Sequence, residues 1–211
     1  MSTSKINRLL YILFFTFCFH GISPAMAIEE AKYDVIEKEG AFEIRKYHDH
    51  IVAETYVDSS FEEASNIAFR ILFKYIDGNN TTKSSIAMTA PVSQQKNSEK
   101  ISMTAPVNMQ EVSGNYRITF LMPSKYTMDT IPRPLDERVK IKKEKGKTFA
   151  AYKYSGGWSK KKYEKMKRKF MAIIDKRNLK ITGEPAFARY NSPFMPWLFR
   201  RNEILIEIFY N

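Results

Sequence analysis

Two histidines in the segment KYHDHIV are the first residues of the chain whose type and spacing suit metal chemistry. His48 and His50 are two positions apart, and on a β-strand that spacing directs both imidazole rings to the same face, as a pair of metal ligands requires. The alternative is an exposed turn, because Asp49 separates the rings and polar residues surround them. The sequence therefore predicts either a metal site at His48 and His50 or a solvated corner.

The rest of the chain offers little material for catalysis. Its one cysteine, Cys18, and its third histidine, His20, both lie in an apolar run near the N-terminus. The motifs of α/β-hydrolases, P-loop nucleotide hydrolases, dinucleotide-binding enzymes and HExxH zinc proteases are absent from the sequence. We therefore assign no catalytic residue, and we expect any reaction to be carried by a bound cofactor.

A predicted helix supplies two cations beside a wide apolar surface. Ser60 and Glu63 form a capping box at its start, and Gly78 follows its end. One face of this helix is apolar, as expected where a helix packs on a sheet. That face comprises Phe61, Ala64, Ala68, Ile71, Leu72 and Tyr75.

The apolar surface of this helix extends beyond that face. Phe69, Phe73 and Ile76 widen it to roughly 200°, more than an ordinary amphipathic helix needs, and Arg70 and Lys74 lie where the aromatics end. One interpretation is a deeply packed helix with two solvated cations. The other is an apolar groove whose cationic rim binds carboxylates.

The same order of elements occurs twice. Residues 33–57 alternate apolar and polar side chains before the first helix, and residues 138–157 do so before a second helix that begins at Ser159. The second β-rich segment is expected to form a hairpin near Gly146. We therefore predict one α+β domain over residues 28–211: a distorted β-barrel or curved antiparallel sheet flanked by two helices, built from a duplicated β-β-α-β-type unit.

A seven-residue phrase is nearly repeated between the two halves. IAMTAPV occupies residues 86–92 and ISMTAPV residues 101–107. Each copy alternates like a strand, and Pro91 and Pro106 place the copies at strand ends or edges. We expect two short strands that pair across the intervening loop, with their methionines in the core or in a ligand-binding wall.

Residues 1–27 have the pattern of a secretory signal peptide. Lys5 and Arg8 precede an apolar run, and an Ala-Met-Ala sequence follows it, so we expect cleavage after Ala27. A membrane anchor is the alternative, but the run is shorter than the roughly 18–20 residues that a span needs. The prediction is an exported protein, bacterial periplasmic or secreted.

The charge of the chain narrows the choice of partners. Its formal net charge is +11, and removal of residues 1–27 takes away two positive charges and leaves +9. In an exported protein this excess favours an anionic membrane surface, an acidic polymer or a carboxylate ligand, and no nucleic-acid partner is expected. The second helix is strongly basic on one side, which suits an anionic surface or simply water. We expect a monomer.

Several stretches of the chain resemble the SOUL haem-binding proteins. They are YDVIEKEGAFEIRKY, HIVAETYV, SSIAMTAPV, EKISMTAPVNMQ, YSGGWS and GEPAFARYNSPFMPWLFRRNEILIEI, in family order over residues 31–209. The resemblance implies a distorted β-barrel with two flanking helices and a bound haem or related porphyrin. The tetrapyrrole is expected beside the first helix, near the loop before the last strand, for carriage, buffering or detoxification. The alternatives are a haem-modifying or haem-degrading enzyme, or an envelope interaction protein that uses its basic second helix.

The resemblance also implies site residues. From the first helix it assigns Phe69, Leu72 and Phe73 to the wall of the groove, and Arg70 and Lys74 to the propionates. From the loop before the last strand it assigns Phe194, Met195 and Trp197. Met195 stands where animal members have a lysine, which puts the propionate clamp in doubt and places a thioether, a competent haem ligand, at the rim.

The sequence RRNE after that loop offers a second anion clamp. Arg200 and Arg201 could hold carboxylates bidentately if they are exposed, and we include Arg200 among the candidate binding residues. Alternatively, Arg201 and Glu203 tie the loop down internally.

Overall fold

The computed structural model describes residues 28–82 and 98–210. Its helices are α2 (Phe61–Ile76) and α3 (Lys160–Lys176), with a short 3₁₀ turn, η1, at Trp197–Phe199. Its longer strands are β2 (Tyr33–Glu39), β3 (Phe42–Tyr47), β4 (His50–Val57), β7 (Val107–Val112), β8 (Asn115–Leu121), β10 (Lys140–Glu144), β11 (Thr148–Ser155), β13 (Ala186–Arg189) and β14 (Arg201–Phe209). Short strands are β1 (Glu29–Glu30), β5 (Asn80–Thr81), β6 (Thr104–Ala105), β9 (Arg133–Pro134) and β12 (Lys180–Ile181). None of the helices in these ranges is long and apolar enough to cross a membrane.

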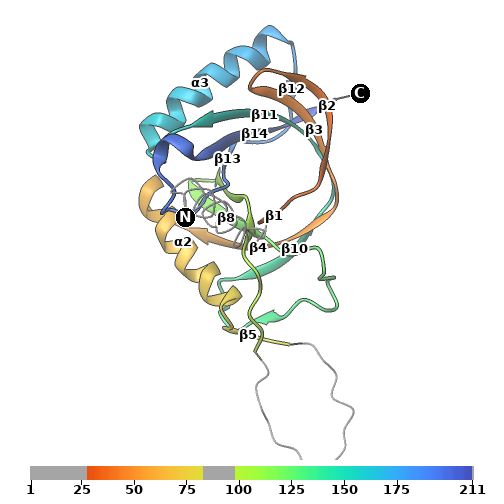
Figure 1. The fold of residues 1–211 in the computed structure, drawn as a ribbon, viewed down its shortest axis with the longest axis vertical. Coiled ribbons are helices and arrows are strands. Elements are labelled where there is room, and N and C mark those ends of the chain that lie inside the picture. Colours follow the sequence, from red (N-terminus) through yellow and green to blue (C-terminus); the bar gives the residue numbers. More distant parts are fainter. Residues whose placement is uncertain (1–27, 83–97, 211) are drawn as a thin grey trace, which may run out of the picture.

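The long strands form one antiparallel sheet that curls into a half-barrel, with α2 and α3 along one side of it, their first turns close together and their later turns diverging (Figure 1). The strand order is β10-β4-β8-β7-β13-β14-β11-β3-β2, and β12 adds to β14. The face away from the helices is concave, because a single hollow of about 510 Å³ there contacts residues from β4, β7, β8, β11, β13 and β14. The predicted α+β class and the curved sheet with two flanking helices are confirmed.

The strand pairing shows how the two halves are related. In the first half β4 pairs with β8 and β8 with β7; in the second, β11 pairs with β14 and β14 with β13. The two halves meet where β7 pairs with β13. Each unit is therefore β-β-α-β-β, one strand longer than the sequence predicted.

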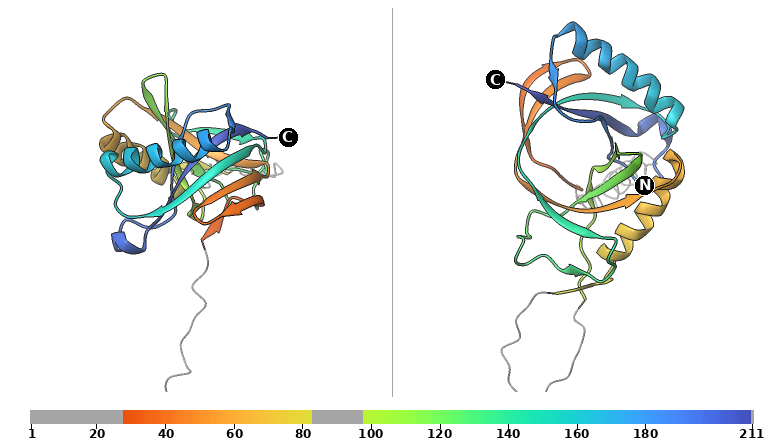
Figure 2. Two further views of the ribbon diagram at one scale, coloured as in Figure 1. Left: turned by 90° about the horizontal axis from the view of Figure 1, so that it is seen from above. Right: turned by 180° about the vertical axis from the view of Figure 1, so that it is seen from behind.

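The prediction of a hairpin near Gly146 is wrong. β10 pairs with β4 and β11 pairs with β3, so the chain turns a corner at Gly146 and does not fold back on itself. The corner between β3 and β4 lies against it: Asp49 accepts a hydrogen bond from the Gly146 amide (2.8 Å), and a Cβ at Gly146 would lie 2.2 Å from the Tyr47 carbonyl oxygen. Only glycine fits this close approach, and the two long arcs can therefore run side by side (Figure 2, right).

Both helices begin where the sequence predicted. The Ser60 hydroxyl accepts a hydrogen bond from the Glu63 amide, and Ser159 caps α3 in the same way through Lys162. Between the helices and the sheet, Phe187 of β13 stacks on Phe61 of α2 (6.1 Å between ring centroids) and lies 5.3 Å from Tyr163 of α3. These aromatic contacts join both helices to the centre of the sheet, where the two halves meet.

A buried ion pair spans the inner face of the sheet. Arg45 of β3 donates two hydrogen bonds to Glu203 of β14, at 2.6 and 3.0 Å, and neither side chain is exposed beyond 2%. Tyr190 and Arg201 donate to the same carboxylate at 2.8 and 3.0 Å. Burial raises the pKa of Glu203, but its hydrogen bonds and the two guanidinium charges outweigh burial and hold the pKa below 4.5.

The structure describes only the second copy of the repeated phrase, so the expected pairing of the two copies stays a prediction. Its first copy, residues 86–92, lies outside the described residues. In the second copy, Thr104 and Ala105 pair in parallel with Glu29 and Glu30 of β1. Met103 is exposed and does not enter the core, because the segment pairs with the start of the domain at the edge of the barrel.

The buried pair gives a first testable prediction. Glu203→Gln is expected to lower the free energy of unfolding by about 3–5 kcal/mol, because the buried Arg45 guanidinium loses its charged bidentate partner and keeps only the single ion pair with Glu43 (2.8 Å). Urea unfolding of the variant measures this loss. The control is Asp136→Asn, which removes the partner of the exposed Arg138 and is expected to change stability by less than about 1 kcal/mol. Similar small losses in both variants would contradict the structural role given to Glu203.

Candidate functional site

A groove of about 530 Å³ lies along α2, on the helix-bearing side of the sheet. One wall is the exposed side of α2, and the other is formed by the loop before α3, the start of β7 and the chain that follows β13. Its lining residues are Glu63, Ser65, Asn66, Ile67, Phe69, Arg70, Val107, Trp158, Arg189, Asn191 and Pro193. A smaller hollow of about 330 Å³ shares Ser65, Asn66, Trp158 and Arg189 with it, so the two form one continuous depression.

Arg189 is the one cation on the sheet side of this groove. Its Nε atom is buried and makes no hydrogen bond, and no carboxylate in the described part of the chain forms an ion pair with it. Its guanidinium lies 5.1 Å from the ring centre of Trp158 and 5.9 Å from that of Phe187. Burial lowers the pKa of Arg189 to about 10, so the group is still cationic at neutral pH. A half-buried cation that has no carboxylate partner and lies beside aromatic walls is suited to an anionic group of a ligand.

Trp158 is held in place from both sides. Its indole Nε1 donates a hydrogen bond to Asn202 Oδ1 (2.8 Å), and the guanidinium of Arg200 lies 4.1 Å from its ring centre. Asn202 is fully buried and also donates to the carbonyl of Gly156 (3.0 Å). The aromatic wall of the groove is therefore rigid, which lowers the entropic cost of binding a flat ligand.

The structure brings some of the predicted helix residues to the groove and not others. Phe69 and Arg70 line it. Phe73, 41% exposed, stacks on Phe69 (5.8 Å between ring centroids), and Lys74 is exposed one turn beyond Arg70, so both flank the groove. Leu72 has no exposed surface and belongs to the core, so its assignment to the groove wall is wrong in this structure. Its helix position turns it towards the sheet.

The predicted loop residues lie outside the groove. Phe194, Met195 and Trp197 are all exposed on the loop between β13 and β14, whereas the neighbouring Asn191 and Pro193 contribute to the lining. Their assignment to the tetrapyrrole site therefore stays a prediction. The loop turns its apolar side chains to solvent because its backbone is bonded to Arg200.

Neither arginine of RRNE is a free anion clamp. Arg200 donates to the carbonyls of Met195 (2.8 Å) and Pro193 (2.7 Å) and supports Trp158. Arg201 bonds Glu203 and Glu30. Of the two interpretations, the internal tie between Arg201 and Glu203 is confirmed. Arg200 affects the groove indirectly, because it supports the Trp158 ring and bonds the backbone of the loop.

Sequence reasoning missed Trp158, Arg189 and Asn191. All three stand in stretches that carry the family resemblance, YSGGWS and AFARYNSP. For Arg189 a signal was available, because strand alternation in AFAR puts Phe187 and Arg189 on the same face, and a large apolar residue marks that face as the covered one. For Trp158 and Asn191, which lie in loops, no periodic pattern exists.

The two histidines do not converge on a common site. His48 Nε2 lies 2.8 Å from Asp34, whereas His50 bonds the His48 carbonyl through Nδ1 and faces Glu144 at 3.5 Å through Nε2. Within residues 28–82 and 98–210, no cluster of three or more His, Cys, Asp or Glu side chains could hold a metal ion. The corner interpretation therefore describes His48 and His50 better than the metal site.

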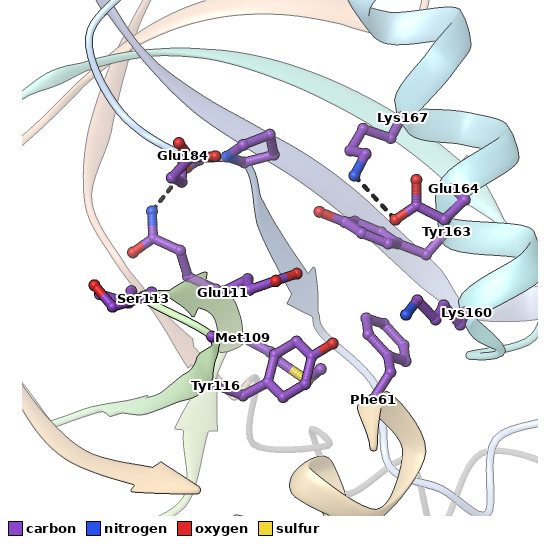
Figure 3. Close-up of a pocket in the computed structure, with 14 residues that line it drawn as sticks. Phe61, Met109, Glu111, Ser113, Tyr116, Lys160, Tyr163, Glu164, Lys167 and Glu184 are labelled. Atoms are coloured by element: carbon purple, nitrogen blue, oxygen red, sulfur yellow. Dashed lines mark hydrogen bonds and ion pairs between the residues drawn. The ribbon is translucent and has the colours of Figure 1, made fainter. Parts of the chain in front are cut away.

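A second hollow on the same side of the sheet, of about 640 Å³, lies between the start of α3 and the β7–β8 turn (Figure 3). It is lined by Tyr116 and Tyr163 and by three carboxylates, Glu111, Glu164 and Glu184. Of these, Glu164 pairs with Lys167 at 2.9 Å. The excess of carboxylates disfavours an anionic ligand. The groove along α2, which has apolar walls and Arg189, is therefore the better site for a ligand that carries carboxylates.

Comparisons with known proteins agree with this choice of ligand. The profile of the family described as SOUL heme-binding protein matches residues 28–207. Heme-binding protein 1 of Xenopus tropicalis is 28% identical over 170 residues, which cover 80% of this chain and 84% of that protein. Heme-binding protein 2 of Homo sapiens is 28% identical over 195 residues, covering 86% and 90%.

Solved structures share the fold alone. The C-terminal domain of EcmrR superposes on 85% of this chain and 99% of that domain with a TM-score of 0.58 at 7% identity. A hydrolase from Listeria innocua covers 82% of this chain and 94% of its own, with a TM-score of 0.50 at 10% identity. The curled sheet with two helices thus occurs in proteins of unrelated sequence.

The His50 environment predicts how stability depends on pH. Burial lowers the pKa of His50, but Glu144 and the His48 carbonyl outweigh it and raise the pKa above 6.5. A raised pKa stabilises the fold below about pH 6.5, and this stabilisation is lost as pH rises through the folded-state pKa. A difference of one in pKa between the folded and unfolded states corresponds to about 1.4 kcal/mol.

Urea unfolding should therefore show wild-type stability falling between about pH 5.5 and about pH 8.5 more steeply than that of His50→Gln. His48→Gln controls for loss of a histidine at the same corner. Equal slopes in wild type and His50→Gln would contradict the prediction.

Proposed function

The chain belongs to the SOUL heme-binding protein family, and from that premise we propose that it binds haem or a related porphyrin in the groove between α2 and Trp158. The observation that carries this proposal is the half-buried guanidinium of Arg189, whose buried Nε makes no hydrogen bond, beside the apolar walls of the groove. A volume of about 530 Å³ is within the range of small-molecule sites.

The walls of the groove fit a flat, apolar ring. Phe69 and Ile67 on the helix face Val107 and Trp158 across the depression. Burial of porphyrin carbon against these side chains supplies the hydrophobic part of the affinity, about 25 cal/mol for each Å² removed from water. The Trp158 ring is already fixed by Asn202 and Arg200, so little ordering is needed on binding.

The cations fit the two propionates of a porphyrin. Arg189 would hold one carboxylate, and such a bond gives a partner to the buried Nε, which otherwise makes no hydrogen bond. Arg70 lies on the opposite wall and is exposed, so it would hold the other at the rim. These two arginines replace the clamp that the sequence placed at Arg70 and Lys74.

Among the described residues, the lining of the groove contains no histidine, cysteine or methionine. Binding would therefore depend chiefly on the ring and the propionates, with the Met195 thioether on the adjoining loop as the candidate iron ligand. A groove open to solvent without a strong protein ligand suits exchange of the tetrapyrrole, as carriage, buffering or detoxification requires. With the leader pattern of residues 1–27, we propose that this occurs outside the cytoplasm, in the periplasm or after secretion.

No observation among the described residues favours a haem-modifying reaction over binding. The named relatives are heme-binding proteins, and none of the three carboxylates of the second hollow lines the groove. The basic side of α3 fits an anionic surface equally well whether or not the groove along α2 holds a tetrapyrrole. Binding is therefore the function proposed, with a monomer as the binding unit.

Haemin titration of Arg189→Met tests the site. We expect one-to-one binding with a shifted Soret band in wild type and an affinity lower by about tenfold to a hundredfold in the variant, as loss of a charged hydrogen bond predicts. The variant should be as stable as wild type or more stable, because it removes an unpaired buried charge. Arg138→Gln, at an exposed arginine outside the groove lining, is the control.

The haemin affinity of Arg189→Met tests the groove independently of the family assignment. Unchanged affinity in a folded Arg189→Met protein would remove this groove from the proposal. Met195→Ala beside the His48/His50 double alanine variant identifies an iron ligand, because only the variant that lacks the ligand should change the haemin spectrum.

A further inference from the structure

The loop between β13 and β14 exposes a continuous run of apolar side chains. Phe194 is 93% exposed and Phe199 is 74% exposed, with Trp197 and Leu198 more than half exposed and Met195 at 38%. Residues 191–199, NSPFMPWLF, contain no charged residue. Soluble monomers rarely leave so large an apolar patch facing water, and such patches mark contact sites.

The exposure of these side chains is imposed by a fixed backbone. Arg200 donates to two carbonyls of the loop, the Met195 amide donates to the Ser192 carbonyl (3.0 Å), and the Phe199 amide donates to the Pro196 carbonyl (2.9 Å). The loop is therefore a preformed apolar tip that cannot fold its aromatics inward without losing these bonds.

Cations surround the base of this tip. Arg200 contacts Trp158, and Trp158 precedes a run of three lysines at the start of α3, Lys160 to Lys162. No ion pair involves these lysines within the described part of the chain. Lys162 packs over Gly156, and the carbonyl of Gly156 accepts a hydrogen bond from Asn202, which follows Arg201. Lys162 therefore lies near the base of the loop, whereas Lys160 lines the second hollow. An apolar tip with cations at its base is the pattern of an interfacial membrane anchor.

The chain enters the domain on the same side as the loop. Arg201, directly after the loop, bonds Glu30 of β1 at 2.9 Å, so the first described residues lie at the base of the tip. The start of the described chain and the blue loop point to the same side of the molecule (Figure 2, left).

We propose that the loop of residues 192–199 inserts into the interfacial region of an anionic bilayer, with Trp197, Leu198 and Phe199 among the acyl chains and the lysines of α3 over the headgroups. Tryptophan and phenylalanine favour this region of a membrane, and each lysine near an anionic surface adds to the attraction. The occupant is lipid because the apolar aromatic tip fits the acyl region and the cations near its base fit anionic headgroups. The proposal does not require a bound tetrapyrrole.

Depth-dependent quenching of Trp197 tests the insertion. The chain contains two tryptophans, and Trp158 is half-buried and hydrogen-bonded beneath Arg200. Full-length protein is mixed with phosphatidylcholine vesicles, with and without phosphatidylglycerol, that contain lipid brominated on its acyl chains. We expect strong quenching on the anionic vesicles in wild type and its loss in Trp197→Phe, which keeps an apolar ring and assigns the signal to position 197.

A triple variant, Phe194→Ser with Leu198→Ser and Phe199→Ser, tests the apolar tip as a whole. These side chains are exposed, so the fold and haemin binding should be retained, while partition onto anionic vesicles falls about tenfold or more. Because residues 9–22 could themselves hold the chain at a vesicle, the quenching of Trp197 is the deciding signal.

Two results would overturn the proposal. One is an unquenched Trp197 on vesicles to which the protein is bound, which would leave the tip to a protein partner. The other is loss of haemin binding in the triple variant together with unquenched Trp197, which would assign the loop to the tetrapyrrole site instead.

Discussion

The buried pair of Arg45 and Glu203 is the interaction on which the inner side of the sheet depends. β11 separates β3 from β14, so the pair bridges three neighbouring strands that belong to both halves of the chain. Two buried charges are tolerated only where their other donors and acceptors are satisfied. Here Glu43 and Tyr47 bond Arg45, and Tyr190 and Arg201 bond Glu203. Through Arg201 the same network fixes β1 and the base of the apolar loop.

The network also sets the direction of the groove residues. Tyr190 must point inward to reach Glu203, and side chains alternate along an extended strand. Arg189 therefore points to the side that carries the helices, where Trp158 and Phe187 meet it. Asn202 follows Arg201 and by the same alternation turns outward to bond Trp158. The polar cluster on the inner face of the sheet therefore decides which neighbouring side chains of β13 and β14 point outward to the groove, because side chains alternate between the two faces of a strand.

Two hollows flank the aromatic contacts at the centre of the sheet, and charge distinguishes them. The hollow at the start of α3 carries more carboxylates than lysines, whereas the groove along α2 contains an unpaired arginine. A chain with a large positive excess nevertheless has an acidic hollow, so net charge alone does not identify a ligand site. Asn191 and Pro193 border both the groove and the exposed loop, and a loop seated in lipid would therefore place the groove mouth at the bilayer surface.

The sequence by itself determined the elements that depend on neighbours along the chain. Ser60 and Ser159 cap the helices, and the apolar period of α2 defines its buried face, because these interactions span only a few residues. The family motifs, which cover most of the chain, identified the ligand class. Tertiary structure alone decided that the chain corners at Asp49 and Gly146 lie against each other and that Leu72 belongs to the core. It also decided that the loop between β13 and β14 exposes Phe194 to solvent. It also decided that Arg189 has no counter-charge. Each of these depends on contacts between segments distant in the sequence, for which no local periodicity provides a signal.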